Sequence, residues 1–491
     1  MTVSSRILAA VSATALLAGC STPVPQALQA PEVPPAFTGP VAPGAAVWPT
    51  PDWWQGFGSP EMTSLITTAE KDNLDIEVAM ANVLQAQANT DIQRSALFPD
   101  LSLSSTASRA RSPGSSITIP TATGPLTYKS ATTQNSFGLG VDASYQVDFW
   151  GLARDNLRAA QETLKSTRYA QQVVALTTVS SVANAYLDVL ALREEIALTQ
   201  QNADAARRIL TVTQAKKTNG ISSELDVAEQ EATVHGLEAQ IPPLREQERE
   251  ATFALAILLG KPPEGFQVTA KNLDGIKAPA VAPGIPSALL ERRPDVAEAE
   301  ANLASAHANV DAARAAFFPQ IGLTGSGGFA SSAIGTIINA SSLEWSVGAS
   351  LAQTIFDGGK LFAESDLAKA EQRGLIATYR KTVLTAFSNV ETSLGQVSNF
   401  GEEQDALDKE VKAAAEAFRI SELQYREGIV DITSVLQTEQ TLFTAENLLV
   451  QSKLARAQAD VSLFESLGGG WAENPDDKTQ VTAPTAAPAK T

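Results

Sequence analysis

The stretch from Leu152 to Thr218 constrains the fold of this chain more than any other part of its sequence. It contains no proline and is rich in Ala, Leu, Gln and Glu, which favour the α-helix. Apolar residues recur along it at spacings of three and four, at Val173, Leu176, Val179, Ala183, Tyr186 and Leu190, and Ile196 follows six residues later. At about 1.5 Å per residue, a helix of roughly 67 residues is about 100 Å long. No globular core has that length, so the helix must pack in a coiled-coil-like array.

The chain also repeats itself. Three short sequences of the first half return in the same order in the second half, at offsets of about 210 residues. The matched stretches are 96–101 with 316–321, 147–151 with 354–358, and 219–221 with 427–429. We therefore expect two structural repeats, 52–277 and 287–473, joined by a Pro-rich linker at 278–286. An extended segment at 20–51 and a disordered Pro/Ala/Thr-rich tail at 474–491 should flank them.

Two strands are expected in each repeat. From residue 137 to residue 149 every odd-numbered residue is apolar, and every even-numbered residue is polar or glycine. The same alternation returns over 343–355, with Gln353 as the exception. The sequence therefore predicts strands at about 100–110 and 136–149, and again at about 320–330 and 342–356, joined by Ser/Gly/Thr-rich loops. Long helical hairpins should follow at 152–259 and 358–467, with a break or kink at Pro242 and Pro243.

Strands of this kind fit a transmembrane β-barrel, because one face is apolar and the other is polar over about ten residues. A hairpin of a soluble β-sandwich would show the same alternation. Four strands cannot close a barrel by themselves, since the smallest bacterial barrels have about eight. An open sheet edge in lipid would leave backbone groups unpaired. If the strands span a membrane, the chain must oligomerise: two copies supply eight strands, and three supply twelve strands with a wider lumen.

Composition narrows the function. The chain has 36 Lys and Arg against 54 Asp and Glu, a formal charge of −18, which offers no footprint for nucleic acid. One cysteine and two histidines, His235 and His307, leave little material for a metal centre or a catalytic triad. We expect no enzymatic activity, no cofactor and no bound metal. The alternatives to a duct are a structural lipoprotein without a lumen and an anchored enzyme that uses paired carboxylates.

The N-terminus predicts the compartment. Residues 1–19 hold one charge, Arg6, followed by an apolar stretch, which is typical of a signal peptide. The stretch ends in Leu-Ala-Gly before Cys20, and this resembles the bacterial lipobox. The resemblance implies cleavage before Cys20 and attachment of palmitate and further acyl chains to it; the alternative is an ordinary leader with an incidental cysteine. In bacterial lipoproteins, Asp after the lipidated cysteine retains the protein in the inner membrane. This chain has Ser21 there, which implies that it is sorted to the outer membrane.

Several motifs resemble the outer-membrane efflux protein family. They are the sequence LERRPDV at 290–296 with its continuation to Pro319, the pair Trp53-Trp54, the sequence LLG at 258–260, and Tyr425-Arg426-Glu427-Gly428. The resemblance is to the TolC-like ducts, in particular the lipoprotein branch that serves resistance-nodulation-division pumps.

This resemblance implies a fold that is mostly α with a membrane β-barrel. Three chains would form one 12-stranded β-barrel in the outer membrane and a periplasmic α-helical barrel with an equatorial domain. The trimer would be the passive exit duct of a tripartite efflux system. A periplasmic adaptor would link it to an inner-membrane pump, and drugs or other small toxic compounds would pass through it. The exported compound stays open, because selectivity should lie in the pump.

Two sets of residues follow as site candidates. The hairpin turns should form the tips that dock on the adaptor, through Asn219, Gly220, Ile221, Gly428, Ile429 and Val430. The periplasmic aperture should be lined and gated by Asp431, Thr433, Ser434 and Gln437 from the second repeat and by Asp226 and Glu229 from the first. Three-fold symmetry would turn each carboxylate into a ring that attracts cations. Close relatives often carry Asp in place of Gln437, so Asp431 or Glu439 would have to supply that ring. Each acid could equally belong to a solvated helix face.

Overall fold

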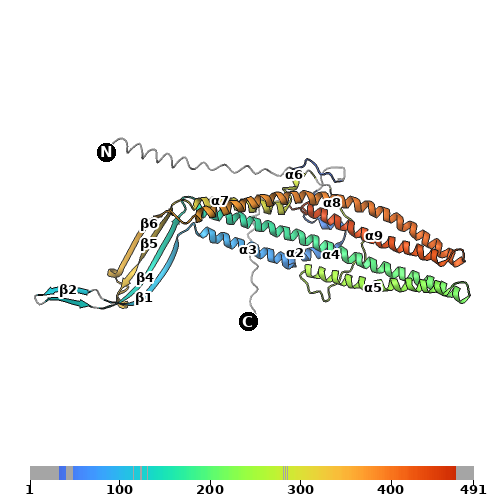
Figure 1. Cartoon of the computed structure of the whole chain (residues 1–491), viewed down its shortest axis with the longest axis horizontal. Coiled ribbons are helices and arrows are strands. Elements are labelled where there is room, and N and C mark those ends of the chain that lie inside the picture. Colours follow the sequence, from blue (N-terminus) through green and yellow to red (C-terminus); the bar gives the residue numbers. More distant parts are fainter. Residues whose placement is uncertain are drawn as a thin grey trace.

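The computed structural model describes residues 33–39, 48–113, 116–121, 124–129, 131–279, 281, 284 and 286–471. The expected signal peptide, the expected lipidation site at Cys20 and the expected tail at 474–491 lie outside the described residues. The molecule is elongated, with a β-sheet at one end and the turns of two long helical hairpins at the other (Figure 1).

Each repeat has a helix, two strands of the main sheet and a long helical hairpin in the same order, with different short elements between them. The first repeat consists of η2 (Trp53–Phe57), α2 (Pro60–Asp72), α3 (Leu74–Ser95), β1 (Asp100–Ser112), β2 (Ser116–Thr121), β3 (Gly124–Lys129), β4 (Thr132–Val147), α4 (Leu152–Thr218) and α5 (Glu224–Leu258). The second repeat consists of α6 (Pro286–Leu289), α7 (Pro294–Ala315), β5 (Gln320–Ser331), η3 (Ile334–Thr336), η4 (Ala340–Ser342), β6 (Leu343–Ala352), α8 (Lys360–Glu427) and α9 (Ile432–Ser466).

The main sheet is antiparallel, in the order β1-β4-β5-β6. Its register brings Val141 opposite Leu103 on one side and opposite Gly327 on the other, and Gly327 opposite Trp345. Directly opposed residues share a face, so the apolar residues of all four strands form one continuous surface. Trp345 and Val347 are 75% and 79% exposed there. A soluble sandwich would bury this face, and no second layer covers it in the described part of the chain.

The outer strands of this sheet have open edges. Within the described residues, β1 pairs only with β4, and β6 pairs only with β5. One long side of each outer strand therefore presents unpaired backbone groups, which is the property that a closed barrel removes.

The strands end where side chains cap the helices that follow. Asp148 accepts hydrogen bonds from the backbone N–H groups of Ala153 (3.0 Å) and Arg154 (3.0 Å). Asp357 does the same for Gly359 (2.9 Å), Lys360 (3.1 Å) and Leu361 (3.0 Å) at the start of α8. These caps satisfy backbone donors that a helix leaves free at its first turn. The cap at Asp148 follows directly on Val147, where β4 ends, before the limit of 149 that the alternation predicts; β6 ends at Ala352, before the limit of 356.

Two details differ from the sequence predictions. A second hairpin, β2–β3, occupies the stretch where a long loop is expected between β1 and β4. Helix α5 continues through Pro242 and Pro243, so the first of the two expectations, a break in the helix, is wrong. Both prolines lie on an exposed face of α5, so water can reach the carbonyl groups that lose their helical partners, while the neighbouring Ile241 is buried.

A core at mid-length joins the two repeats. The ring of Trp53 stacks on the ring of Phe464 of α9 with centroids 4.9 Å apart, and the ring of Phe57 contacts Phe464 edge-on. This aromatic group packs on α4 together with Met62 and Ile66 of α2. Next to it Gly468 has a φ of 87°, and a Cβ there would lie 1.8 Å from the carbonyl oxygen of Arg292, so only glycine fits. The mid-length region is therefore the rigid centre from which both hairpins extend.

Candidate functional site at the hairpin tips

Both hairpin turns lie at the end of the molecule opposite to the sheet (Figure 1). Gly220 follows α4 with a φ of 75°, and Gly428 follows α8 with a φ of 77°. A Cβ at either glycine would meet no atom within 4 Å, so the positive φ is what requires glycine there. Each glycine is followed by an exposed isoleucine: Ile221 is 72% exposed and Ile429 is 71% exposed. Two exposed apolar side chains thus mark the tips, beside the exposed Asn219 and the half-buried Val430.

Two of the predicted aperture residues cap helices. Asp226 accepts a hydrogen bond from the backbone of Ser223 (2.9 Å) and another from its hydroxyl group (2.8 Å), and Ser223 caps the backbone of Asp226 in return. These bonds, above all the backbone bond, lower the pKa of Asp226. In the second repeat the acid is the N-cap residue itself: Asp431 accepts from the backbone (3.1 Å) and hydroxyl group (3.0 Å) of Ser434. Both acids therefore fix the start of a helix.

The remaining aperture candidates lie on the first turns of α5 and α9. Thr433 and Gln437 are exposed, as is Asp431, whereas Ser434 and Glu229 are half-buried. The structure thus brings the second-repeat candidates together on the first two turns of α9.

Glu439 does not lie on that surface. Its side chain is 1% exposed, packed between the two hairpins against Gln230 of α5. The expectation that Glu439 supplies a ring of charge in the aperture is therefore wrong, because the residue points into the protein rather than into a lumen.

The sequence analysis missed the contacts that tie the two tips to each other. The buried Tyr425 of α8 donates a hydrogen bond from its hydroxyl group to Thr213 of α4 (3.0 Å), and this hydroxyl lies 3.3 Å from that of Ser222. Lys216 of α4 donates to the backbone carbonyl of Tyr425, and its Nζ lies 4.1 Å from the centroid of the tyrosine ring. The motif that begins at Tyr425 indicated the protein family. It did not indicate which residues of α4 the tyrosine contacts.

An amphipathic sheet with open edges, joined to long helical hairpins whose turns meet at the far end, defines an outer-membrane duct. The family described as outer membrane efflux protein matches residues 65–261 and 285–469. The chain belongs to this family.

Comparisons with individual relatives support membership of this family. The chain is 40% identical over 423 residues to the pyoverdine export outer membrane protein OpmQ of Pseudomonas aeruginosa, which covers 85% of this chain and 87% of the relative. It is 32% identical over 472 residues to the antibiotic efflux pump outer membrane protein ArpC of Pseudomonas putida, covering 95% of this chain and 96% of the relative. The crystal structure of the Campylobacter jejuni CmeC outer membrane channel superposes with a TM-score of 0.82 at 23% identity, covering 91% of this chain and 94% of that one, and shows the same fold.

These matches confirm the predicted fold class, a mostly α, TolC-like channel with a β domain. The protein is an outer-membrane efflux channel and not an enzyme.

Proposed function

We propose that three copies of this chain form one passive exit duct. The observation that carries the proposal is the four-stranded sheet with an apolar outer face and two open edges. Pairing β6 of one copy with β1 of the next removes every open edge, and three copies supply twelve strands. Acylation of Cys20 adds a second attachment to the outer membrane.

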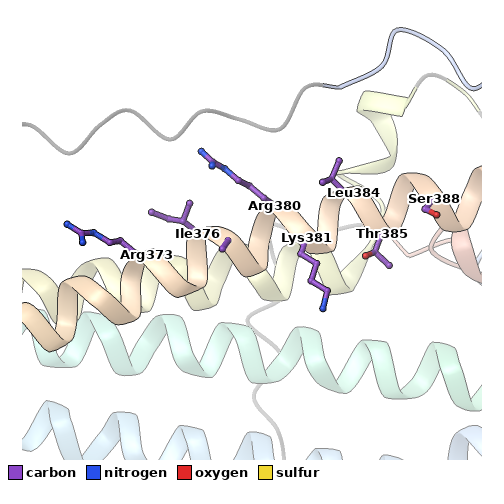
Figure 2. A pocket seen from close by; sticks show the side chains of 8 residues that line it. Arg373, Ile376, Arg380, Lys381, Leu384, Thr385 and Ser388 are labelled. Atoms are coloured by element: carbon purple, nitrogen blue, oxygen red, sulfur yellow. The ribbon is translucent and has the colours of Figure 1, made fainter.

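Complementary charges on two helices support the same arrangement. Helices α3 and α8 lie at opposite edges of the helical layer, α3 next to β1 and α8 next to β6 (Figure 1). On α8 the side chains of Arg373 and Arg380 point away from the bundle (Figure 2). On α3 Asp75 and Glu77 are exposed. Among the described residues none of these four forms an ion pair within the chain, which leaves them available to a neighbouring copy.

The two charged sites lie at matching depths. Arg380 is 20 residues from the start of α8, and Glu77 is 18 residues from the end of α3. Both therefore lie about 30 Å from the sheet, since each residue adds about 1.5 Å. If β6 and β1 pair between copies, the same pairing brings Arg380 of one copy to the level of Glu77 of the next.

The tips are the surface for the periplasmic adaptor, which connects the duct to an inner-membrane resistance-nodulation-division pump. Ile221 and Ile429 supply exposed apolar side chains at the end of each hairpin, beside Asn219, Gly220, Gly428 and Val430. Large apolar side chains that no part of the chain covers are typical of protein contact sites.

The aperture is closed by the second hairpin. Asp431, Thr433, Ser434 and Gln437 line it on α9, with Asp226 and Glu229 on α5. The contacts of Tyr425 with Thr213 and Lys216 hold α8 against α4 in the packed arrangement. Opening requires that these contacts separate.

The substrates are drugs or other small toxic compounds that the pump delivers. The relatives named for pyoverdine export and antibiotic efflux make pyoverdine and antibiotics the first compounds to test.

Substitution of the tip isoleucines tests the docking proposal. Ile221→Asp combined with Ile429→Asp places charge on both tips and should abolish export of an antibiotic by cells that depend on this channel. Outer-membrane level and acylation should stay unchanged, because neither side chain packs in a core. Ile257→Asp, an exposed isoleucine far from the tips, is the matched control and should leave export intact. Normal export by the double variant would contradict the assignment of the tips.

A further inference from the structure

A line of polar residues runs along the contact between α9 and the first hairpin. Glu439, Glu446 and Lys453 follow one another at intervals of seven residues, so they share one face of α9. Their partners across the contact are Gln230 of α5 (3.4 Å), Asn202 of α4 (3.2 Å) and Glu194 of α4 (2.9 Å). We call this line the polar seam.

The seam is deeply buried at its tip end. Gln230 is fully buried, and its amide nitrogen donates to the carbonyl of Ala206 (3.1 Å) and to Oε2 of Glu439. Within the described residues, Oε1 of Gln230 and Oε1 of Glu439 both lack a hydrogen-bond partner. Buried oxygens without partners are costly, and a proton on Glu439 would supply the donor that this pair lacks.

No cation compensates this carboxylate. From α8 the charge that acts on it is Glu422, a like charge that forms an ion pair with Arg426. From α4 the nearby Arg207 is engaged by Asp204 and by Glu238 of α5. Among the described residues no lysine or arginine pairs with Glu439, so burial raises its pKa to about 7, against the small opposing effect of Gln230.

The rest of the seam divides into two kinds of contact. Burial also raises the pKa of Glu446, which meets only the amide of Asn202. Lys453, in contrast, forms ion pairs with Glu194 and Asp274 (3.4 Å). Glu439 lies about 10 Å along α9 from its start, and Lys453 lies about 30 Å along it. The contacts near the tip thus depend on protons, while the contact nearer the centre depends on opposite charges.

We propose that the polar seam is a proton-dependent latch, in which protonated Glu439 and Glu446 hold the second hairpin against the first and their ionisation releases it. The inference rests on the proposed function as a gated duct. The ion pair of Lys453 with Glu194 is the pivot, because it joins two opposite charges directly (2.9 Å).

The direction follows from the proton count. The packed seam holds Glu439 protonated up to about pH 7, whereas in a solvated, released seam the carboxyl would lose its proton near 4.5. The packed arrangement binds more protons, so it is favoured as the pH falls and loses stability as the pH rises from about 4.5 to about 7. Across that window Glu439 alone shifts the equilibrium by up to about 10²-fold. Above this pH window Glu439 is ionised in both the packed and the released seam, so the equilibrium no longer depends on pH.

Conductance in planar bilayers tests the latch with the full acylated protein. The wild-type conductance should rise between pH 5 and pH 7.5. Glu439→Gln has the shape of the protonated glutamate but cannot ionise. It should therefore remain at the low conductance that the wild type shows at pH 5. Glu231→Gln, at the exposed neighbour of Gln230, is the matched control and should follow the wild type. A pH-independent wild type, or an unchanged pH profile in Glu439→Gln, would overturn the proposal.

A distance measurement separates this proposal from the channel function. Spin labels at Gln214→Cys on α4 and Leu423→Cys on α8, both exposed, report the separation of the hairpins, with excess unlabelled protein to dilute contacts between copies. The distance should lengthen as the pH rises in the wild type and stay short in Glu439→Gln. If nothing conducts at any pH but the distances change as expected, the duct proposal fails and the latch stands. Distances that do not change with pH would refute the latch.

Discussion

At the scale of single residues, the acids at the start of α5 and α9 combine two properties. Asp226 and Asp431 each accept hydrogen bonds from a serine and thereby fix the first turn of a helix. Each is also a negative charge close to a tip, where three copies would form a ring. Structural and electrostatic roles at one position can be separated only by a substitution that removes the charge but keeps the cap.

Asp431→Asn is that substitution, because asparagine caps helices as well as aspartate does. It should leave thermal stability unchanged and lower the cation selectivity of the channel, measured as the reversal potential under a salt gradient. Asp431→Ala should in addition lose about 1 kcal/mol of stability with the cap. An Asn variant with the selectivity of the wild type would remove Asp431 from the aperture.

At the scale of elements, the sequence predicted those helices and strands that depend on a local pattern of residues. The absence of proline and the spacing of three and four predicted α4, which the structure shows as one helix from Leu152 to Thr218. The alternation predicted β4 but not its end at Val147, because the cap formed by Asp148 depends on three-dimensional geometry. The continuity of α5 through Pro242 was missed, because the exposure of that face follows from packing on α4.

The candidate site was harder to predict than the fold. The glycine turns were readable from the sequence, since their neighbours repeat between the halves. The burial of Glu439 and the contact of Tyr425 with Thr213 were not, because each joins residues about 210 positions apart across two hairpins.

The proposed contact between α8 and α3 of neighbouring copies also belongs to this scale. Arg380→Glu should place like charges together and weaken the oligomer by about 1 kcal/mol at each contact. Glu77→Arg should do the same, and the two changes together should restore the wild-type strength. The measurement is the detergent concentration or temperature at which the oligomer dissociates.

The control for these charge reversals is Arg245→Glu, at an exposed residue of α5. It should leave the oligomer as stable as the wild type. Two single variants that weaken the oligomer without mutual rescue would contradict the pairing of Arg380 with Glu77.

At the scale of the whole molecule, the proposed duct makes this chain one third of a tube. Its sheet has an apolar outer face and two open edges, its mid-length core is rigid, and its hairpins end in exposed apolar tips. A single copy leaves the edges, the charged faces of α3 and α8, and the tips uncovered. In the proposed duct, assembly into a ring would cover the edges and the charged faces, and the adaptor would cover the tips.

The mass of the purified protein tests this account most directly. The mature protein is extracted from outer membranes in a mild detergent, shown by circular dichroism to be folded, and measured by light scattering with the detergent contribution subtracted. We expect three times the mass of one protomer, which supplies twelve strands for a closed barrel. A folded monomer or dimer would contradict the three-fold duct.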